Sequence, residues 1–338
     1  MITLLGGGIG ASRFSKALTE VVPEEQLTCV VNTADDLWLY GLRICPDIDT
    51  TLYAHAGLKD DERGWGLKGD SFRVMEQMGK LGEQPWFNLG DLDLATHLLR
   101  TGLLRQGETL THITSRFVET MGVQLHVLPM TEQEVETYVL TPKGWLHYQQ
   151  FLVRYNAQDS VTQICYRGSE TAQPGPGVID AIMQAELVII APSNPYASVV
   201  PMLSLPGVRR ALAETTATVM AITPIVSGVP IEEPGEAKRA RSRATLMMSQ
   251  GLPHKASAVA SLYQDIVDVF VLDEADRQEA SYIESPGMKV VLAPTLFHKT
   301  TSGAMAIERL LHTISGFNKG CTVAILPQPL RRRNADHK

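Results

Sequence analysis

The chain has 338 residues, of which 44% are hydrophobic and 20% are charged, as is ordinary for a globular protein with a sizeable core. Its net charge of -7 and isoelectric point near 5.7 argue against a nucleic-acid-binding protein, which would carry a basic surface. The four cysteines are widely spaced and form no CxxC pair, so neither a zinc site nor a disulfide framework is expected. No apolar stretch is long enough to span a membrane and no secretory leader is visible, so we expect a cytoplasmic protein.

The N-terminal residues have the order of a strand–helix–strand unit. Apolar Ile2–Leu5 runs into a glycine-rich turn, Ala11–Val21 has helix composition, and Leu27–Val31 is a second apolar strand. Parallel strands of this kind are buried on both faces of a sheet. This order predicts the first unit of an α/β fold.

The glycine-rich turn satisfies the pattern GxGxxG/A between a strand and a helix. Glycine lets the backbone approach anionic oxygens, and the helix N-terminus offers amides and a positive dipole end. We therefore predict a diphosphate-binding loop, with Arg13 as an added cation; a tight turn without a ligand is the alternative. The predicted nucleotide-binding residues of this loop are Gly6, Gly7, Gly8, Gly10 and Arg13. A nicotinamide-dependent oxidoreductase is disfavoured, because the second strand closes with Asn32-Thr33 where that class needs an acid.

Residues 32–50 carry four aspartates just beyond the second strand. Acids at this density suit a magnesium ion that also binds substrate phosphates, and the carboxyl edge of an α/β sheet is where ligand sites gather. We predict Asp36 and Asp49 as metal ligands, and Asp49 or Asp47 as the catalytic group that orients or deprotonates a hydroxyl. Trp38, in the same segment, offers a flat surface for an aromatic ligand. Helix caps and turns are the alternative explanation for the acids.

The rest of the chain predicts a Rossmann-like, doubly wound, mostly parallel sheet with an inserted smaller α+β region. Residues 1–90 and 170–317 form the expected core, 91–169 the insertion, and 318–338 a loosely ordered tail. Four further apolar segments are predicted core strands: Leu187–Ala191, Thr218–Thr223, Val267–Leu272 and Lys289–Ala293.

Two further segments carry polar residues at predicted loops. Ser193 and Asn194 follow the strand that ends at Ala191 and are expected to hold a guanosine; loop closure and capping explain them equally well. Residues 86–97 combine aromatic rings, an amide and two acids before a helix. There Asp91 could be only a helix cap, and His97 is expected to be a structural hydrogen-bonding group.

Five segments together resemble the 2-phospho-L-lactate transferase (CofD-like) family of coenzyme F-420 biosynthesis. They are NTADDLWLYGLRICPDIDT from residue 32, WFNLGDLDLATHLLRTG from 86, LPMT from 128, PGPGVIDAI from 174 and IIAPSNPYASVVPMLSLPGVR from 189. The resemblance runs from Met1 to about Asp276. It departs from the family pattern at Arg13, where lysine is more familiar, and at 231–241, which keep only a trace of the family's Gly-Pro-Ala-x-Lys-Leu-Met signal.

The resemblance implies a Mg²⁺-dependent transferase. The ribityl hydroxyl of the deazaflavin Fo would attack the phosphorus next to the acid of a diphosphoguanosine ester, and GMP would leave. The acid could be phospholactate, phosphoenolpyruvate or 3-phosphoglycerate. The expected partners are Fo and this guanosine ester, in a homodimer. By motif position, Asp49 and Asn88 contact Fo, and we expect Trp38, Trp86 and Asp91 around them. The competing interpretation is a non-enzymatic nucleotide- or nucleotide-sugar-binding regulatory protein on the same core.

Overall fold

A seven-stranded sheet forms the centre of the computed structural model, which describes residues 1–228, 234–285, 287–297 and 300–315. All of its pairings are parallel, so the predicted doubly wound α/β sheet is confirmed. The predicted tail, 318–338, lies outside the described residues. In spatial order, the strands are β12 (Lys289–Leu292), β11 (Val269–Leu272), β10 (Thr218–Ile222), β9 (Leu187–Ile190), β1 (Ile2–Gly6), β2 (Leu27–Val31) and β5 (His126–Pro129).

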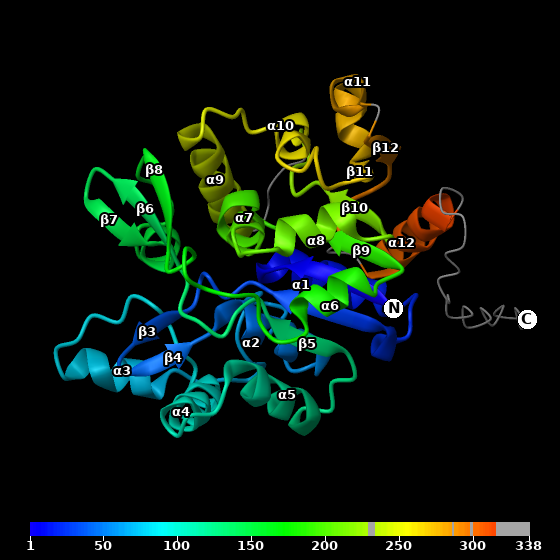
Figure 1. Cartoon of the computed structure of the whole chain (residues 1–338). Coiled ribbons are helices and arrows are strands. Elements are labelled where there is room, and N and C mark those ends of the chain that lie inside the picture. The colour runs from blue at the N-terminus through cyan, green and yellow to red at the C-terminus, as the bar shows by residue number, and fades with distance from the viewer. Residues whose placement is uncertain (229–233, 286, 298–299, 316–338) are drawn as a thin grey trace, which may run out of the picture.

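Helices cover both faces of this sheet (Figure 1). Side chains alternate along β1, so that Ile2 and Leu4 enter one apolar core and Leu5 the other. The first core includes α1 (Gly8–Leu18), α2 (Pro46–His55), α5 (Leu110–Thr120) and α12 (Thr300–Ser315). The second includes α6 (Val178–Met183), α7 (Val200–Leu203), α8 (Val208–Glu214), α9 (Pro234–Ser249), α10 (Ala256–Ser261) and α11 (Ala280–Ile283). None of the helices in the described ranges is long and apolar enough to cross a membrane.

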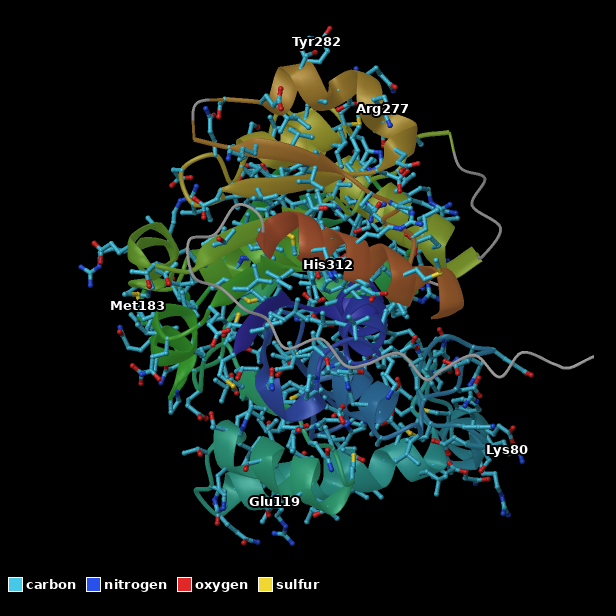
Figure 2. The ribbon with its side chains drawn as sticks, turned by 90° about the vertical axis from the view of Figure 1, so that its right-hand side faces the viewer. Lys80, Glu119, Met183, Arg277, Tyr282 and His312 are labelled. Atoms are coloured by element: carbon cyan, nitrogen blue, oxygen red, sulfur yellow. The ribbon has the colours of Figure 1, made fainter. Side chains whose placement is uncertain are left out.

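The strand order contains a reversal between β1 and β9. From β1 the chain builds outward through β2 to β5, then returns to the other side of β1 and continues from β9 to β12. The loops that follow β1 and β9 therefore leave the sheet in opposite directions and open a crevice at its carboxyl edge. In a turned view, α5 with Glu119 and α11 with Tyr282 mark opposite ends of the molecule (Figure 2).

Two small sheets extend the core. A hairpin of β3 (Leu37–Leu39) and β4 (Leu42–Ile44) follows β2, and leads through α2 to α3 (Arg73–Lys80) and α4 (Asp91–Arg105). An antiparallel sheet of β7 (Gly144–His147), β6 (Glu136–Thr141) and β8 (Gln163–Arg167) lies between β5 and α6 in the chain. The predicted insertion 91–169 thus contains this small sheet, but β5 within it pairs with β2 as an edge strand of the main sheet.

Burial at the centre of the sheet predicts a large stability effect. Leu5 is fully buried on β1, between β2 and β9. Leu5→Ala should lower the free energy of unfolding by about 2–5 kcal/mol, because it removes buried methyl groups and leaves a cavity. Leu98→Ala, at a side chain that is 59% exposed on α4, should change it by less than about 0.5 kcal/mol. Urea denaturation measures both, and equal costs would contradict this placement of β1.

Candidate functional site

A cavity of about 990 Å³ opens at the carboxyl edge of the parallel sheet, at the crevice between the loops after β1 and β9. Its walls come from these loops, the segments after β2, β10 and β12, and helices α2, α4 and α9, together with residues 65–66, 86–88, 148–149 and 152–153. Most of the residues predicted from the sequence line it: Gly7, Gly8, Gly10, Arg13, Asp47, Asp49, Trp86, Asn88, Ser193 and Asn194. Gly6, Asp36, Trp38 and Asp91 are not among its lining residues.

The glycine loop packs directly against the loop after β9. The Ser193 hydroxyl donates to the carbonyl of Gly7 (2.9 Å) and accepts from its N–H (3.2 Å). A Cβ atom at Gly10 would lie 2.3 Å from the carbonyl oxygen of Pro192, so only glycine fits there. The sequence predicts that Ser193 holds guanosine, but its hydroxyl hydrogen-bonds to Gly7 and so joins the two loops.

The carboxylate of Asp47 occupies part of the space in front of the glycine loop. It accepts hydrogen bonds from the Asn32 side chain (3.0 Å) and from the backbone of Gly8, and a Cβ at Gly7 would lie 2.1 Å from its Oδ2. Burial raises the pKa of Asp47 to about 6, although these hydrogen bonds oppose the rise. The loop therefore already has an anion of the protein beside it, and a phosphate here would lie next to a carboxyl group.

Asp35 is a cavity-lining acid that the sequence analysis did not select. Its Oδ1 is buried without a hydrogen-bond partner, and its pKa is raised by burial and then by the neighbouring charges of Asp47 and Asp36. Asp36, the expected metal ligand, instead lies 3.5 Å from the guanidinium of Arg43, and burial raises its pKa to about 7. Adjacent residues in this turn point in different directions, which the sequence alone does not reveal.

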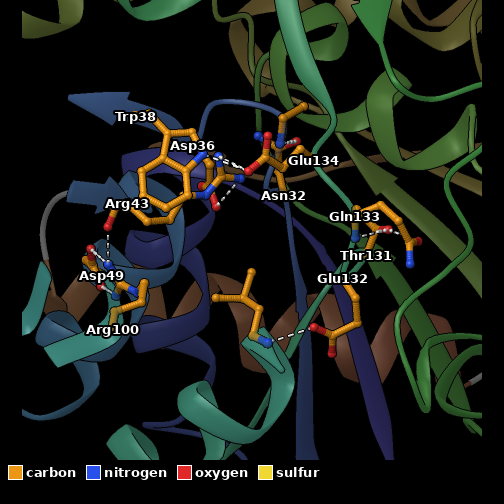
Figure 3. A network of polar contacts seen from close by, with 12 residues as sticks. Asn32, Asp36, Trp38, Arg43, Asp49, Arg100, Thr131, Glu132, Gln133 and Glu134 are labelled. Atoms are coloured by element: carbon orange, nitrogen blue, oxygen red, sulfur yellow. Dashed lines mark hydrogen bonds and ion pairs between the residues drawn. The ribbon is translucent and has the colours of Figure 1, made fainter. Parts of the chain in front are cut away.

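Asp49 belongs to a buried network on α2 and α4. Both of its oxygens accept from the guanidinium of Arg100, which is itself fully buried (Figure 3). The ring of His97 lies between Asp49 (Nδ1 to Oδ2, 3.6 Å) and Asp93 (Nε2 to Oδ2, 3.3 Å), and Tyr53 donates to Asp93 (2.6 Å). Asp49, Asp93 and His97 could together hold a metal ion, since their ligand atoms lie within 4.8 Å of one another.

Sequence reasoning missed Arg100 and Asp93 in this network. A signal for them exists in the spacing of α4, where Asp93, His97 and Arg100 follow one another at intervals of four and three residues. Such residues share one face of a helix. His97, expected to be a structural hydrogen-bonding group, lines the cavity on this face.

Aromatic rings form one part of the cavity wall. Trp86 and Phe87 stack edge to face with their ring centroids 5.7 Å apart, and Trp65, which the sequence analysis did not select, also lines the cavity. Trp38 lies elsewhere: its ring is 43% exposed, its Nε1 donates to Glu134 (2.7 Å), and the guanidinium of Arg43 lies over it (Figure 3).

Two aspartates fix the loop that carries Trp86 by reciprocal capping. Asp91 opens α4, but its carboxylate accepts from the backbone N–H groups of Arg73 (3.1 Å) and Val74 (3.0 Å) at the start of α3. Asp70, just before α3, accepts from the N–H groups of Leu92 (2.8 Å) and Asp93 (3.1 Å) at the start of α4. The sequence predicts Asp91 near the Fo site. In the structure it caps the start of α3 and does not line the cavity.

Asn194 performs both capping and contact roles. Its side-chain oxygen accepts from the backbone of Tyr196 and Ala197, and its amide donates to the hydroxyl of Tyr148 (3.4 Å). It still lines the cavity, beside Ser193. Asn194 therefore caps the following turn, as the alternative interpretation proposed, and also lines the cavity.

A family model described as 2-phospho-L-lactate transferase CofD matches residues 2–295. The chain belongs to this family. It is therefore related to transferases of coenzyme F-420 biosynthesis, as the sequence resemblance implied.

Named relatives of the CofD family cover most of this chain. A 2-phospho-L-lactate transferase from Methanosarcina mazei is 37% identical over 297 residues, which cover 88% of this chain and 95% of the relative. A phosphoenolpyruvate transferase from Kitasatospora aureofaciens is 35% identical over 302 residues, covering 87% and 92%. A solved structure of a UPF0052 family member from Bacillus halodurans aligns with a TM-score of 0.51 at 17% identity, covering 87% of this chain and 92% of that one. This last similarity concerns the fold alone.

The raised pKa of Asp47 predicts a pH-dependent stability. The folded chain holds this proton more tightly than the unfolded chain, in which the pKa is near 3.8. The stabilisation is therefore complete below pH 3.8 and is lost as the pH rises to about 6. Asp47→Asn cannot titrate, so the unfolding free energy of the wild type minus that of the variant should fall by about 2–3 kcal/mol between pH 4 and pH 7. Urea denaturation in chelator-containing buffer measures this difference; a constant value would contradict the assignment.

Proposed function

We propose that this protein transfers a phospho-acid group from its diphosphoguanosine ester to the ribityl hydroxyl of Fo and releases GMP. The observation that carries the proposal is the joining, in one cavity, of a switch-point glycine loop, a group of carboxylates and an aromatic wall. The relatives named 2-phospho-L-lactate transferase and phosphoenolpyruvate transferase support the same reaction class. The transferred group is phospholactyl, phosphoenolpyruvyl or phosphoglyceryl.

The nucleotide half of the donor lies at the switch point. Gly7, Gly8 and Gly10 leave room for phosphate oxygens, and Arg13 lines the cavity one turn into α1. Asn194 approaches the guanosine from the loop after β9, while Ser193 holds the two loops in register. Gly6 contributes by close packing, since a Cβ there would lie 2.8 Å from that of Ala191.

The carboxylates divide into two groups with different tasks. In the part of the chain that the structure describes, no cation pairs with Asp35 or Asp47, and Asp35 keeps an oxygen without a partner, so this pair fits Mg²⁺. A bound Mg²⁺ would neutralise phosphate charge beside the glycine loop. Asp36 is replaced in this role because it pairs with Arg43. Asp49, expected as a second metal ligand, is already compensated by Arg100, which makes its group with Asp93 and His97 the weaker cation site.

Asp49 is instead positioned to orient the acceptor. Arg100 fixes its carboxylate in one direction at the cavity wall, where a remaining lone pair accepts a hydrogen bond from the ribityl hydroxyl. The hydroxyl oxygen then forms a bond to the phosphorus next to the acid, and the bond from this phosphorus to the oxygen of GMP breaks. The hydroxyl proton passes to the carboxylate of Asp49 or Asp47. GMP leaves with the electron pair of the broken bond. Positioning and charge neutralisation, more than covalent chemistry, lower the barrier to such a transfer.

The deazaflavin lies against the aromatic wall. Trp86 and Phe87 offer a flat surface, Trp65 adds a third ring, and Asn88 supplies polar contacts at the edge. Trp38 does not contribute, because its ring contacts Glu134 and Arg43 outside the cavity. We also propose a homodimer, because closed twofold assemblies are the commonest oligomers. The proposed location is the cytoplasm.

Removal of divalent cations tests the carboxylate pair. With Fo and a guanylated acid, excess chelator should lower turnover at least about 100-fold, and added Mg²⁺ should restore it, because two adjacent acids cannot neutralise a diphosphate. Asp35→Asn should raise the Mg²⁺ concentration needed for half-maximal turnover about tenfold or more. Asp265→Asn, before β11 at the opposite edge of the sheet, is the control and should leave it unchanged. Full turnover in chelator would exclude the proposed metal role.

Tryptophan substitutions test the aromatic wall and the choice between enzyme and regulatory protein. Trp86→Leu should weaken Fo binding by about 1 kcal/mol or more, the scale of a lost aromatic contact, and leave GDP affinity nearly intact. Trp145→Leu on β7, outside the cavity, is the matched control, and Trp38→Leu should resemble it. Quenching of tryptophan emission by Fo measures the affinities. A wild-type protein that binds GDP or a nucleotide sugar but not Fo would favour the regulatory alternative.

A further inference from the structure

Helix α9 lines the cavity with charged residues to which the proposed reaction has assigned no task. Its cavity-facing side carries three cations and one acid: Glu236, Lys238, Arg239 and Arg243. The helix runs from Pro234 to Ser249, and this side of it forms one wall of the cavity.

Within the described residues, Glu236 is the acid that contacts the guanidinium groups of this wall. Glu236 pairs with Arg239 (3.0 Å) and is also the acid nearest to Arg243, whose Nη2 lies 4.0 Å from it. The side chain of Arg243 is only 11% exposed, and its Nε donates to the ring of His254 (3.3 Å). Among the described residues, the carboxylate nearest to the buried guanidinium of Arg243 is therefore 4.0 Å away and also pairs with Arg239, and a buried cation without a full counter-charge has a high desolvation cost.

Lys238 has no acidic partner among the described residues. It is half-buried, and its pKa is lowered by burial and by the neighbouring charges of Arg239 and Arg241. Lys238 thus faces the cavity with two cations, Arg239 and Arg241, beside it. An anionic ligand would stabilise this arrangement.

The wall is fixed to the switch point. The hydroxyl of Tyr148 lies 2.9 Å from that of Ser242 on α9, and the amide of Asn194 donates to the same tyrosine oxygen. The α9 cations and the loop after β9 therefore border the same space. The acids Asp35, Asp47 and Asp49 come from the β2–α2 side, so the cavity has an acidic side and a basic side.

We propose that Lys238 and Arg243 form an anion-recognition wall that binds the donor through its carboxylate or its diphosphate oxygens. The inference rests on the proposed function, and it assigns to α9 the selection of a donor that carries negative charge at its acid end. All three possible acids share a carboxylate, and an ammonium or guanidinium group binds carboxylate and phosphate oxygens through charge-assisted hydrogen bonds.

Calorimetric titration of the full-length protein tests the wall with two ligands. One is GDP, which has the diphosphate but no carboxylate, and the other is the guanylated phosphoenolpyruvate ester, which has both. Lys238→Met and Arg243→Met should each weaken binding of the ester about tenfold or more, the effect of losing one charged hydrogen bond. Arg241→Met is the matched control: it removes the same charge from the same helix, but Arg241 is exposed, donates to the backbone of Asn156 and lies outside the cavity.

The two ligands separate the two sources of negative charge. Weaker binding of the ester with unchanged binding of GDP assigns the wall to the carboxylate, and equal weakening of both assigns it to the diphosphate. Thermal midpoints establish whether the variants are folded. If Arg243→Met does not fold, Lys238→Met still tests the wall, because the side chain of Lys238 is only half-buried. Unchanged affinities for both ligands in folded Lys238→Met, with normal transfer to Fo, would overturn the inference and leave the proposed function intact. A wild type that binds both nucleotides but not Fo would instead remove the proposed function, while the comparison of variants on α9 still decides the role of the wall.

Discussion

The close contact between the loops after β1 and β9 is the constraint on which the site depends. Gly10 lies against the carbonyl of Pro192, and Ser193 makes two hydrogen bonds to Gly7, so the two loops form one rigid edge. The strand order makes the chain diverge at this point, and the divergence opens the crevice at which the cavity lies. The acids, the aromatic rings and the basic helix are then placed by the elements that surround this edge.

Electrostatics distinguishes the parts of the cavity that are complete from those that need a ligand. Asp49 accepts two hydrogen bonds from the buried Arg100, and Asp36 lies 3.5 Å from the buried Arg43, so each has a cation of the protein beside it, although burial still raises the pKa of Asp36. Asp35 and Asp47 repel one another in a buried environment, and Lys238 has cations for neighbours. A divalent cation would compensate the first group and an anionic donor the second. The unsatisfied charges thus lie where the proposed reactants meet.

The fold was largely predictable, and the site only in part. Apolar strand segments and the glycine pattern predict the parallel sheet, because burial on both faces leaves a continuous apolar run in the sequence. The strand β5 was assigned to the insertion, since its four residues pair with a strand distant in the chain. Direction within a turn was not predictable: Asp35 faces the cavity and Asp36 does not. Trp38 and Asp91 have suitable chemistry, but Glu134 and the start of α3 hold them elsewhere.

The reciprocal caps of Asp70 and Asp91 make α3 and the aromatic loop a single cooperative unit. Helix α3 buries Met75 against a small hydrophobic cluster, with Met78 packed beside it, and the capping bonds join its start to the start of α4. If those bonds open, α3 and the chain leading to Trp86 lose order together, as a local unfolding unit. A planar ligand seated on Trp86 would reverse this by slowing amide exchange along α3, a helix that it never touches. The rate of amide exchange in the surface helix α3 would then report whether the cavity is occupied.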